Sequence, residues 1–395
     1  MNLPTVSELP DTLSSALAAQ EAAGLRRQRR VQHTPCGPHE LDEEGHSILA
    51  FASNDYLGLA NAPELIASAQ QAAARWGVGA GASALVSGHS AAHEALEQAL
   101  AAFTGFEAAL SFSTGYLANL AVMPALLGRG DAIFADRLNH ASLVDGALLA
   151  RAELQRYAHC DMGMLARQLD ASRARRKLIV SDAVFSMDGD VAPLADLLAL
   201  AERHDAWLLL DDAHGFGVLG PQGRGSLAEA GLASPRIILM ATLGKAAGVA
   251  GAFVAASQTV IDWLLQKARP YIFTTAPPAL LAETSQTALQ LIAASDTRRA
   301  HLQGLIDALH RGLAGLPWQL LPSRTPIQPL IVGDNEASIA LSAALLARGL
   351  RVPAIRPPTV PAGSARLRIS LSAAHSLEDV AQLCQALHEI AGEMK

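Results

Sequence analysis

The chain has 395 residues, of which 50% are hydrophobic and 17% are charged, and its formal net charge is −7. This length exceeds what one small core needs, so two unequal domains are expected, and the acidic balance argues against a nucleic-acid binder, which would need a basic face. The three cysteines, Cys36, Cys160 and Cys384, show neither metal spacing nor a disulfide framework, so the sequence predicts a reducing, cytoplasmic setting.

Residues 1–50 are expected to form an N-terminal arm. A helix is predicted around Leu13 to Gln28, and a short strand near Ile48 to Ala52. The basic cluster from Arg26 to Arg30 fits either a solvated helix face or an anion-binding patch. No basic segment followed by an apolar one opens the chain, so no signal peptide is expected.

From about Glu107 onward, apolar strand-like runs alternate with helical ones. Continuous apolar strands separated by helices indicate an α/β fold with a mainly parallel, seven-stranded sheet covered by helices on both faces. The expected bounds of this large domain are 51–280. The strands are predicted at Ala108–Ser113, Ala132–Ala135, Leu154–Tyr157, Lys177–Ser181, Trp207–Leu210, Ile237–Ala241 and Ala252–Ala255, and helices between them at Leu117–Leu127, Ser142–Arg151 and Leu194–His204.

The window from Ile237 to Ala256 is almost wholly apolar and resembles a membrane span in composition. It holds Lys245 near its middle, and a lysine at the bilayer centre costs about 2.5–3.5 kcal/mol. Two buried strands joined by a glycine-rich turn explain the window better, so no membrane association is expected.

After Pro277 the pattern changes to a smaller α+β lobe, with expected bounds of 281–395. A long helical region is predicted to about Leu316. The later elements are expected at Ile327–Val332, Ala337–Gly349, Val352–Ile355 and Leu367–Leu371, with a closing helix from Leu377.

Two strand ends carry the strongest chemical signal. Asp211 ends one buried strand and is followed three residues later by His214, and Lys245 lies in the turn after the next strand. A lysine that forms a Schiff base and an acid that keeps a pyridine nitrogen protonated are what a protein needs to hold pyridoxal phosphate. Taken alone, Asp211 could equally be an acid that caps a helix, and His214 could be a structural histidine. The two together at one strand end are a stronger signal of a ligand site.

Lys245 lies in an uncharged window from Ile237 to Ser257, which argues against a surface lysine. An apolar setting destabilises the charged form and favours the neutral amine that a nucleophile needs. Thr242 precedes it by three residues, within reach of a phosphate oxygen.

Three weaker signals lie beside other predicted strand ends. Gly115 and Tyr116 open a predicted helix, whose first N–H groups suit a phosphate or form a plain connection. His140 either stacks on a flat ring or is a loop histidine near the cap of the next helix. Ser186 lies just past a strand end, where a turn residue is the alternative.

Two glycine-containing segments are expected to be structural. Gly77 to Gly81 departs from the dinucleotide-binding pattern and follows no clear strand. Gly88-His-Ser90-Ala-Ala92 lacks the last glycine of a nucleophile elbow, so Ser90 is expected to cap a helix that Gly105 ends.

An ordered series of motifs covers nearly the whole chain and resembles the α-oxoamine synthases, a family of fold-type I pyridoxal-phosphate transferases. The series comprises Ser53–Leu59, Leu85–Gly88, His93-x-x-Leu-Glu97, Asp136–Ser142, Phe185–Asp190, Asp211–Gly215, Thr242–Lys245, Ile327–Gly333, Ala354–Pro361 and Ala365–Arg368. Relatives often carry glycines or an arginine where this chain has Ala82 and Ala84.

The resemblance implies a role for each matching position toward the cofactor. Lys245 would carry the Schiff base, Asp211 would pair with the pyridine nitrogen, His214 would contact the ring hydroxyl, and His140 would stack over the ring and face the substrate. The phosphate would be held by Gly115, Tyr116 and Thr242 with Ser186 nearby, and by Thr274 and Thr275 of the other subunit of a homodimer whose active sites lie at the interface.

The resemblance also implies substrates. Arg368 and Asn54 would bind the amino-acid carboxylate, Arg26 the far carboxylate of the acyl chain, and Thr359 the substrate; no metal is expected. The closest member type joins L-alanine to a pimeloyl thioester with loss of carbon dioxide, and the nearest rival uses glycine with acetyl-CoA or succinyl-CoA. A nicotinamide-dependent dehydrogenase and a non-catalytic binding protein are the distant rivals. The first predicts a colourless protein that binds NAD, and the second gives no reason for Lys245 to lie in an apolar window.

Overall fold

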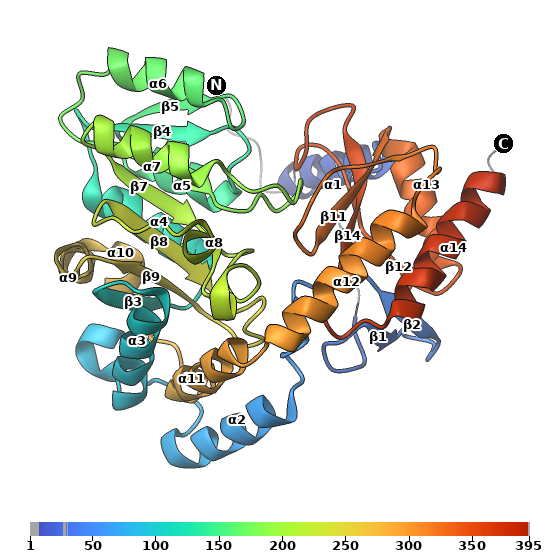
Figure 1. The fold of residues 1–395 in the computed structure, drawn as a ribbon, viewed down its shortest axis with the longest axis horizontal. Helices are drawn as coiled ribbons and strands as arrows, with labels where there is room; N and C mark the ends of the chain where they lie inside the picture. Colours follow the sequence, from blue (N-terminus) through green and yellow to red (C-terminus); the bar gives the residue numbers. More distant parts are fainter. Residues whose placement is uncertain (1–7, 27–28, 30, 394–395) are drawn as a thin grey trace.

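The largest element of the fold is a sheet of seven strands in the order β3-β9-β8-β7-β6-β4-β5 (Figure 1). The structure is a computed structural model that describes residues 8–26, 29 and 31–393. Neighbouring strands are parallel, except that β9 runs antiparallel to β3 and β8. The strands are β3 (Ala108–Phe112), β4 (Ala132–Asp136), β5 (Glu153–Tyr157), β6 (Lys177–Asp182), β7 (Trp207–Asp211), β8 (Ile237–Thr242) and β9 (Ala252–Ala256), which confirms the predicted set.

Both faces of this sheet are buried, because consecutive side chains of a strand point to opposite sides. In β4, Ala132 and Phe134 belong to one apolar core, and Ile133 and Ala135 belong to another. The first core includes helices α3 (Ala91–Thr104), α6 (Met162–Ala171), α7 (Leu194–Arg203) and α11 (Ala279–Ala293); the second includes α4 (Gly115–Leu126), α5 (Ala141–Leu149) and α9 (Gln258–Lys267). This two-sided cover is why the strands read as continuous apolar runs.

The C-terminal part is built on a four-stranded antiparallel sheet, β10-β11-β14-β13, with α12, α13 and α14 beside it (Figure 1). The long helical region predicted to about Leu316 consists of two helices, since α11 ends at Ala293 and α12 begins at Asp296. Between them, the Ser295 hydroxyl donates to the carbonyl of Leu291 at 2.6 Å and so competes with the helical ladder. The elements are α12 (Asp296–Gly312), β10 (Gln319–Leu320), β11 (Ile327–Gly333), α13 (Asn335–Leu346), β13 (Ala354–Ile355), β14 (Ala365–Ser370) and α14 (Leu377–Glu393).

A small third sheet joins distant parts of the sequence. Strand β2 (Ser47–Ala50) pairs with β1 (His39–Leu41) on one side and, in parallel, with β12 (Leu350–Arg351) on the other. The segment before residue 51 is therefore tied to the C-terminal part, and the domain boundaries at 50 and 280 stay a prediction. The remaining elements are α2 (Pro63–Trp76), a π-helical turn η1 (Ala84–Gly88), a 3₁₀ turn η2 (Pro221–Gly223), α8 (Ser226–Ala230) and α10 (Arg269–Ile272).

The predicted bounds of the N-terminal helix are wrong. Helix α1 covers Glu8–Ala22 and not Leu13 to Gln28, and residues 27 and 28 lie outside the described residues. The chain leaves the helix at Gly24, whose φ of +64° is in the left-handed region that commonly ends helices. Arg26 therefore follows the helix instead of lying on its face.

Two expectations about short segments are confirmed. The window from Ile237 to Ala256 forms β8 and β9 with a turn between them, and Ser90 caps α3, which ends at Gly105 in the left-handed conformation. Within the part of the chain that the structure describes, no helix is both long and apolar enough to cross a bilayer.

The fold brings four polar residues to one edge of the large sheet. Asp136, Asp182, Asp211 and Thr242 end β4, β6, β7 and β8, four strands whose remaining residues are largely buried apolar side chains. Parallel strands place their carboxyl ends at the same edge, which is where open α/β sheets bind ligands. This edge carries the candidate site.

Candidate active site

Asp211 is a buried carboxylate held by two donors. Its Oδ1 accepts the backbone N–H of Ala213 at 3.0 Å, and its Oδ2 accepts Nδ2 of Asn119, on α4, at 2.8 Å. Only 4% of Asp211 is exposed. A fixed negative charge in so dry a place suits a cationic partner such as a protonated heterocycle nitrogen.

Lys245 lies in the turn after β8, with its Nζ 2.8 Å from Nε2 of His214. Burial lowers the pKa of Lys245 to about 8, although the charges of Asp211 and Asp182 act in the opposite direction. A substantial share of this amine is therefore neutral near physiological pH, as a Schiff-base nucleophile requires.

His214 is neutral at the centre of a hydrogen-bond chain. Burial, and then the neighbouring charges of Lys245 and Arg368, hold its pKa well below the usual value. Oη of Tyr56 lies 2.6 Å from Nδ1 of His214 and 3.1 Å from Oδ1 of Asn54. His214 is therefore held at both ring nitrogens, by Tyr56 at Nδ1 and by Lys245 at Nε2.

Arg368, on β14, is a buried guanidinium surrounded by neutral acceptors. It donates to the carbonyl of Ser186 at 2.6 Å, to Oδ1 of Asn54 at 3.2 Å and to Oγ of Ser370 at 2.7 Å. Among the described residues, no carboxylate forms an ion pair with it, whereas Arg366 on the same strand pairs with Asp188. Since a buried arginine is usually paired, Arg368 is suited to bind the carboxylate of a ligand.

His140 is placed by the strand end beside it. Its backbone N–H donates to Oδ2 of Asp182 at 2.7 Å, and its Nδ1 lies 2.7 Å from Oγ of Ser142. Burial, together with the charge of Asp211, raises the pKa of Asp182 well above its usual value, and burial lowers the pKa of His140. His140 is the N-cap residue of α5, and its ring accepts the N–H of Ser142, so the position near the helix cap is confirmed; the charges of Asp211 and Lys245 act on the same ring.

The start of α4 has the geometry of an anion site. Thr114 caps this helix by accepting the N–H of Leu117 at 3.2 Å, and Gly115 and Tyr116 form its first turn. N–H groups in a first helical turn lack intrahelical acceptors and favour anions such as phosphate. The hydroxyl of Thr242 donates to the carbonyl of Gly251 at 3.0 Å, so it must rotate before it can donate to a phosphate.

Four residues predicted to bind ligands lie apart from the Lys245 cluster or on the surface. Arg26 has a side chain that is 48% exposed and pairs with Glu21 on the same arm. Thr359 is exposed in the loop between β13 and β14. Thr274 and Thr275 follow α10, and Thr275 bridges to Ser83 beside η1. Their ligand contacts stay predictions.

Comparison with known proteins decides the family. A model of the family described as aminotransferase class I and II matches residues 46–387. The chain belongs to the aminotransferase class I and II family. A curated relative from Aromatoleum aromaticum, named 8-amino-7-oxononanoate synthase, is 64% identical and covers 97% of this chain and 99% of its own. The resemblance inferred from the sequence motifs is thereby confirmed.

Solved structures agree with this family assignment. Sphingomonas wittichii serine palmitoyltransferase superposes with a TM-score of 0.92 at 34% identity, and the match covers 99% of each chain. A structure described as SPT with PLP has a TM-score of 0.92 at 30% identity, again over 99% of each chain. The whole aminotransferase-family fold, including the C-terminal sheet, is therefore shared with these proteins.

Sequence reasoning missed four residues of this aminotransferase-family site: Tyr56, Asn119, Ser142 and Asp182. Asp182 ends a buried strand just as Asp211 does, so the same pattern was available for it. Asn119 is the one polar residue inside the buried part of helix α4, which was a usable signal. Tyr56 and Ser142 had no such signal, since their importance depends on partners 158 and 23 residues away.

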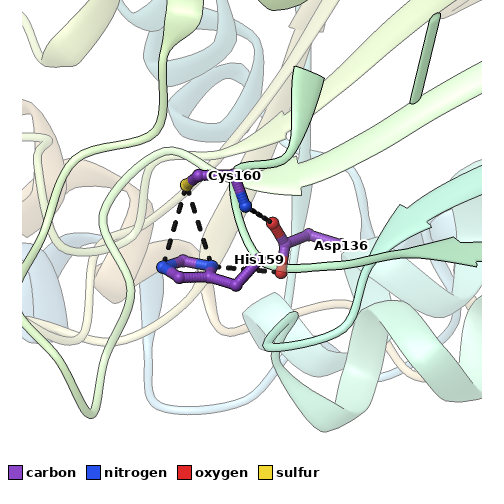
Figure 2. Close-up of side chains that lie close together, drawn as sticks. All are labelled: Asp136, His159 and Cys160. Atoms are coloured by element: carbon purple, nitrogen blue, oxygen red, sulfur yellow. Dashed lines mark hydrogen bonds and ion pairs between the residues drawn. The ribbon is translucent and has the colours of Figure 1, made fainter. Parts of the chain in front are cut away.

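A second cluster at this edge of the aminotransferase-family sheet could be mistaken for a metal site (Figure 2). Asp136, His159 and Cys160 place ligand atoms within 4.8 Å of one another. However, His159 lies 3.2 Å from Asp136 and 2.8 Å from Asp190 through its two ring nitrogens. Burial opposes the charge, but these hydrogen bonds raise the pKa of His159 to about 12, so protons occupy both nitrogens and the cluster is an ion-pair clamp.

Proposed function

We propose that this chain catalyses the pyridoxal-phosphate-dependent condensation of L-alanine with a pimeloyl thioester, with release of carbon dioxide and the thiol carrier, to give 8-amino-7-oxononanoate for biotin biosynthesis. The observation that carries this proposal is the high identity to a synthase of that name over nearly the full chain. The site supports it, since Lys245, Asp211 and Arg368 converge on one sheet edge.

The residues present fit pyridoxal phosphate. When bound, the cofactor supplies an aldehyde for an amine and a ring that accepts electrons released at the amino-acid α-carbon. Lys245 offers a buried amine with a lowered pKa, Asp211 a fixed carboxylate for the ring nitrogen, and the start of α4 an anion site. Thr242, the last residue of β8, and Ser186, in a turn, lie next to this group of residues.

The chain's own groups divide the work between binding and proton transfer. Arg368 and Asn54 would hold the amino-acid carboxylate, which orients the α-carbon toward Lys245. Lys245 would hold and release the α-proton at Nζ, a task for which a pKa of about 8 is suited. His214, neutral and buried, would donate or accept one hydrogen bond without adding charge.

A homodimer is part of the proposal. The surface near Thr274 and Thr275 exposes large apolar side chains: Val86 is 78% exposed and Phe273 is 70% exposed. Exposed apolar groups of this size favour a partner surface, and a second copy would bring these threonines toward its neighbour's phosphate. Arg26 and Thr359 would then contact the acyl substrate. The cytoplasmic location stays a prediction.

The decisive experiment combines trapping with a substrate panel. Borohydride reduction of the purified protein, followed by peptide mass spectrometry, is expected to place a pyridoxyl group on Lys245. L-Alanine or glycine is then offered with pimeloyl, acetyl and succinyl thioesters, and only L-alanine with the pimeloyl thioester is expected to turn over efficiently. An adduct on another residue would overturn the site, and preference for glycine with a short acyl group would overturn the substrates.

A further inference from the structure

A chain of hydrogen bonds connects Asp211 to the ring of His140 through two buried residues. Nδ2 of Asn119 lies 2.8 Å from Oδ2 of Asp211 and 2.9 Å from Oγ of Ser142. Oγ of Ser142 in turn lies 2.7 Å from Nδ1 of His140. Asn119 is 0% exposed and Ser142 is 1% exposed, so bulk water does not compete for the contacts of Asn119, whereas His140 at the other end is exposed.

The donors and acceptors along these hydrogen bonds favour one arrangement of protons. A carboxylate accepts and cannot donate, so Asn119 presents its NH₂ group to Asp211. The second N–H of that group is donated to Oγ of Ser142. The serine oxygen accepts this bond and keeps its own proton, which it can donate to Nδ1 of His140.

A second donor supports the same assignment. The backbone N–H of Ser142 points at Nδ1 of His140, at 3.3 Å. On the other side, Asp182 holds the backbone of His140 in place. We propose that Asn119 and Ser142 are positioning residues that hold His140 as the neutral tautomer with its proton on Nε2.

The charged groups around His140 act in both directions. Asp211 and Asp145 favour a protonated ring, and Lys245 opposes it. Burial raises the pKa of Asp182, which accepts the backbone N–H of His140. Like burial, the two donors to Nδ1 favour the neutral ring. Protonation of Nδ1 would remove the lone pair that accepts their hydrogen bonds.

The inference rests on the proposed function for the purpose of the ring. A neutral imidazole can lie against a cationic pyridine ring, whereas an imidazolium would repel it. The fixed tautomer also leaves one N–H, at Nε2, to donate to a substrate or cofactor oxygen. Asn119 thereby couples the two groups expected to flank the ring, Asp211 and His140.

The test reads the two ring nitrogens of His140 by ¹⁵N NMR on the full-length, histidine-labelled, cofactor-loaded protein. The resonances are assigned by their loss in a His140→Gln variant. We expect Nδ1 to show the shift of an unprotonated nitrogen and Nε2 that of a protonated one near neutral pH. A protonated Nδ1, in either the other tautomer or the imidazolium, would overturn the proposal without any variant.

Variants of the two positioning residues test the cause. Ser142→Ala is expected to mix the tautomers and to raise the pKa of His140 by about half a unit or more, the equivalent of one lost hydrogen bond. Asn119→Ala is expected to act in the same direction, with no further effect when Ser142→Ala is already present. Ser285→Ala is the matched control, because it removes a buried hydroxyl that has no partner among the described residues.

An unchanged tautomer and pKa in folded Ser142→Ala protein would refute the positioning role. The readout needs no turnover, so it separates this inference from the proposed function. A protein with the expected tautomer but no synthase activity would overturn the function alone, and an active enzyme with the other tautomer would overturn the inference alone.

Discussion

Arg368 offers the sharpest test of the site, because its guanidinium is buried and its acceptors are all neutral. The substitution Arg368→Met keeps an unbranched side chain and removes the charge. A hydrogen bond to a charged group contributes about 1.5–3 kcal/mol, and about 1.36 kcal/mol equals a factor of ten. The KM for L-alanine is therefore expected to rise about 10- to 150-fold.

The same strand supplies a matched control. Arg366 is also buried, but it pairs with Asp188 at 2.5 Å. Arg366→Met leaves that carboxylate unpaired, so it is expected to lower the melting temperature more than Arg368→Met does, while raising the KM for L-alanine less.

Steady-state kinetics with varied L-alanine at saturating thioester, together with thermal melts of both variants, give the two readouts. The crossed pattern, in which one arginine governs KM and the other governs stability, is specific to a carboxylate-binding role for Arg368. An unchanged KM in Arg368→Met, or an equal rise in both variants, would refute this reasoning.

Four further outcomes are expected. Capture of pyridoxal phosphate by the cofactor-free protein should accelerate as pH rises through about 8, because Lys245 must lose its proton; a pH-independent rate between pH 6 and 10 would contradict this. Asp211→Asn should move that midpoint to lower pH, since the Asp211 charge raises the pKa of Lys245, and should weaken retention of the cofactor, as measured by absorbance after dialysis. The pKa of His159 is raised in the folded state, so the stability that its ion pairs contribute is complete below about pH 6.5 and is lost as the pH rises toward 12. In urea unfolding, His159→Gln should therefore lower the free energy of unfolding more at about pH 6 than at about pH 9. The reverse order would exclude the ion-pair clamp. Gly146→Ala would place a Cβ 2.7 Å from the carbonyl oxygen of Asn119, so it should cost about 1–3 kcal/mol of unfolding free energy, whereas Gly128→Ala, with nothing within 4 Å, should cost much less.

The strands of the large sheet could be located from the amino-acid sequence alone. Its seven strands are buried on both faces, so each is a short continuous apolar run, and the pattern is local enough to read directly. The sequence also identified Asp211, His214 and Lys245 as candidate site residues. A carboxylate at the end of a buried strand and a lysine in an apolar window are unusual in their local sequence, so they can be recognised without knowing their contacts. The bounds of the N-terminal helix were wrong, and the break near residue 294 was not foreseen, because Gly24 and Ser295 act through backbone conformation and local hydrogen bonds that hydrophobic periodicity does not record.

Which polar residues act together could be read only from the folded chain. Asn54 and Tyr56 reach Arg368 across more than 300 positions, and Asn119 meets Asp211 across 92. Such contacts depend on which strands become neighbours in the sheet and on how the C-terminal lobe docks, and no short-range pattern carries that information. The same holds for chemical state: the amine of Lys245 and the ring of His214 depart from their usual pKa values because the folded chain removes water and arranges charges around them.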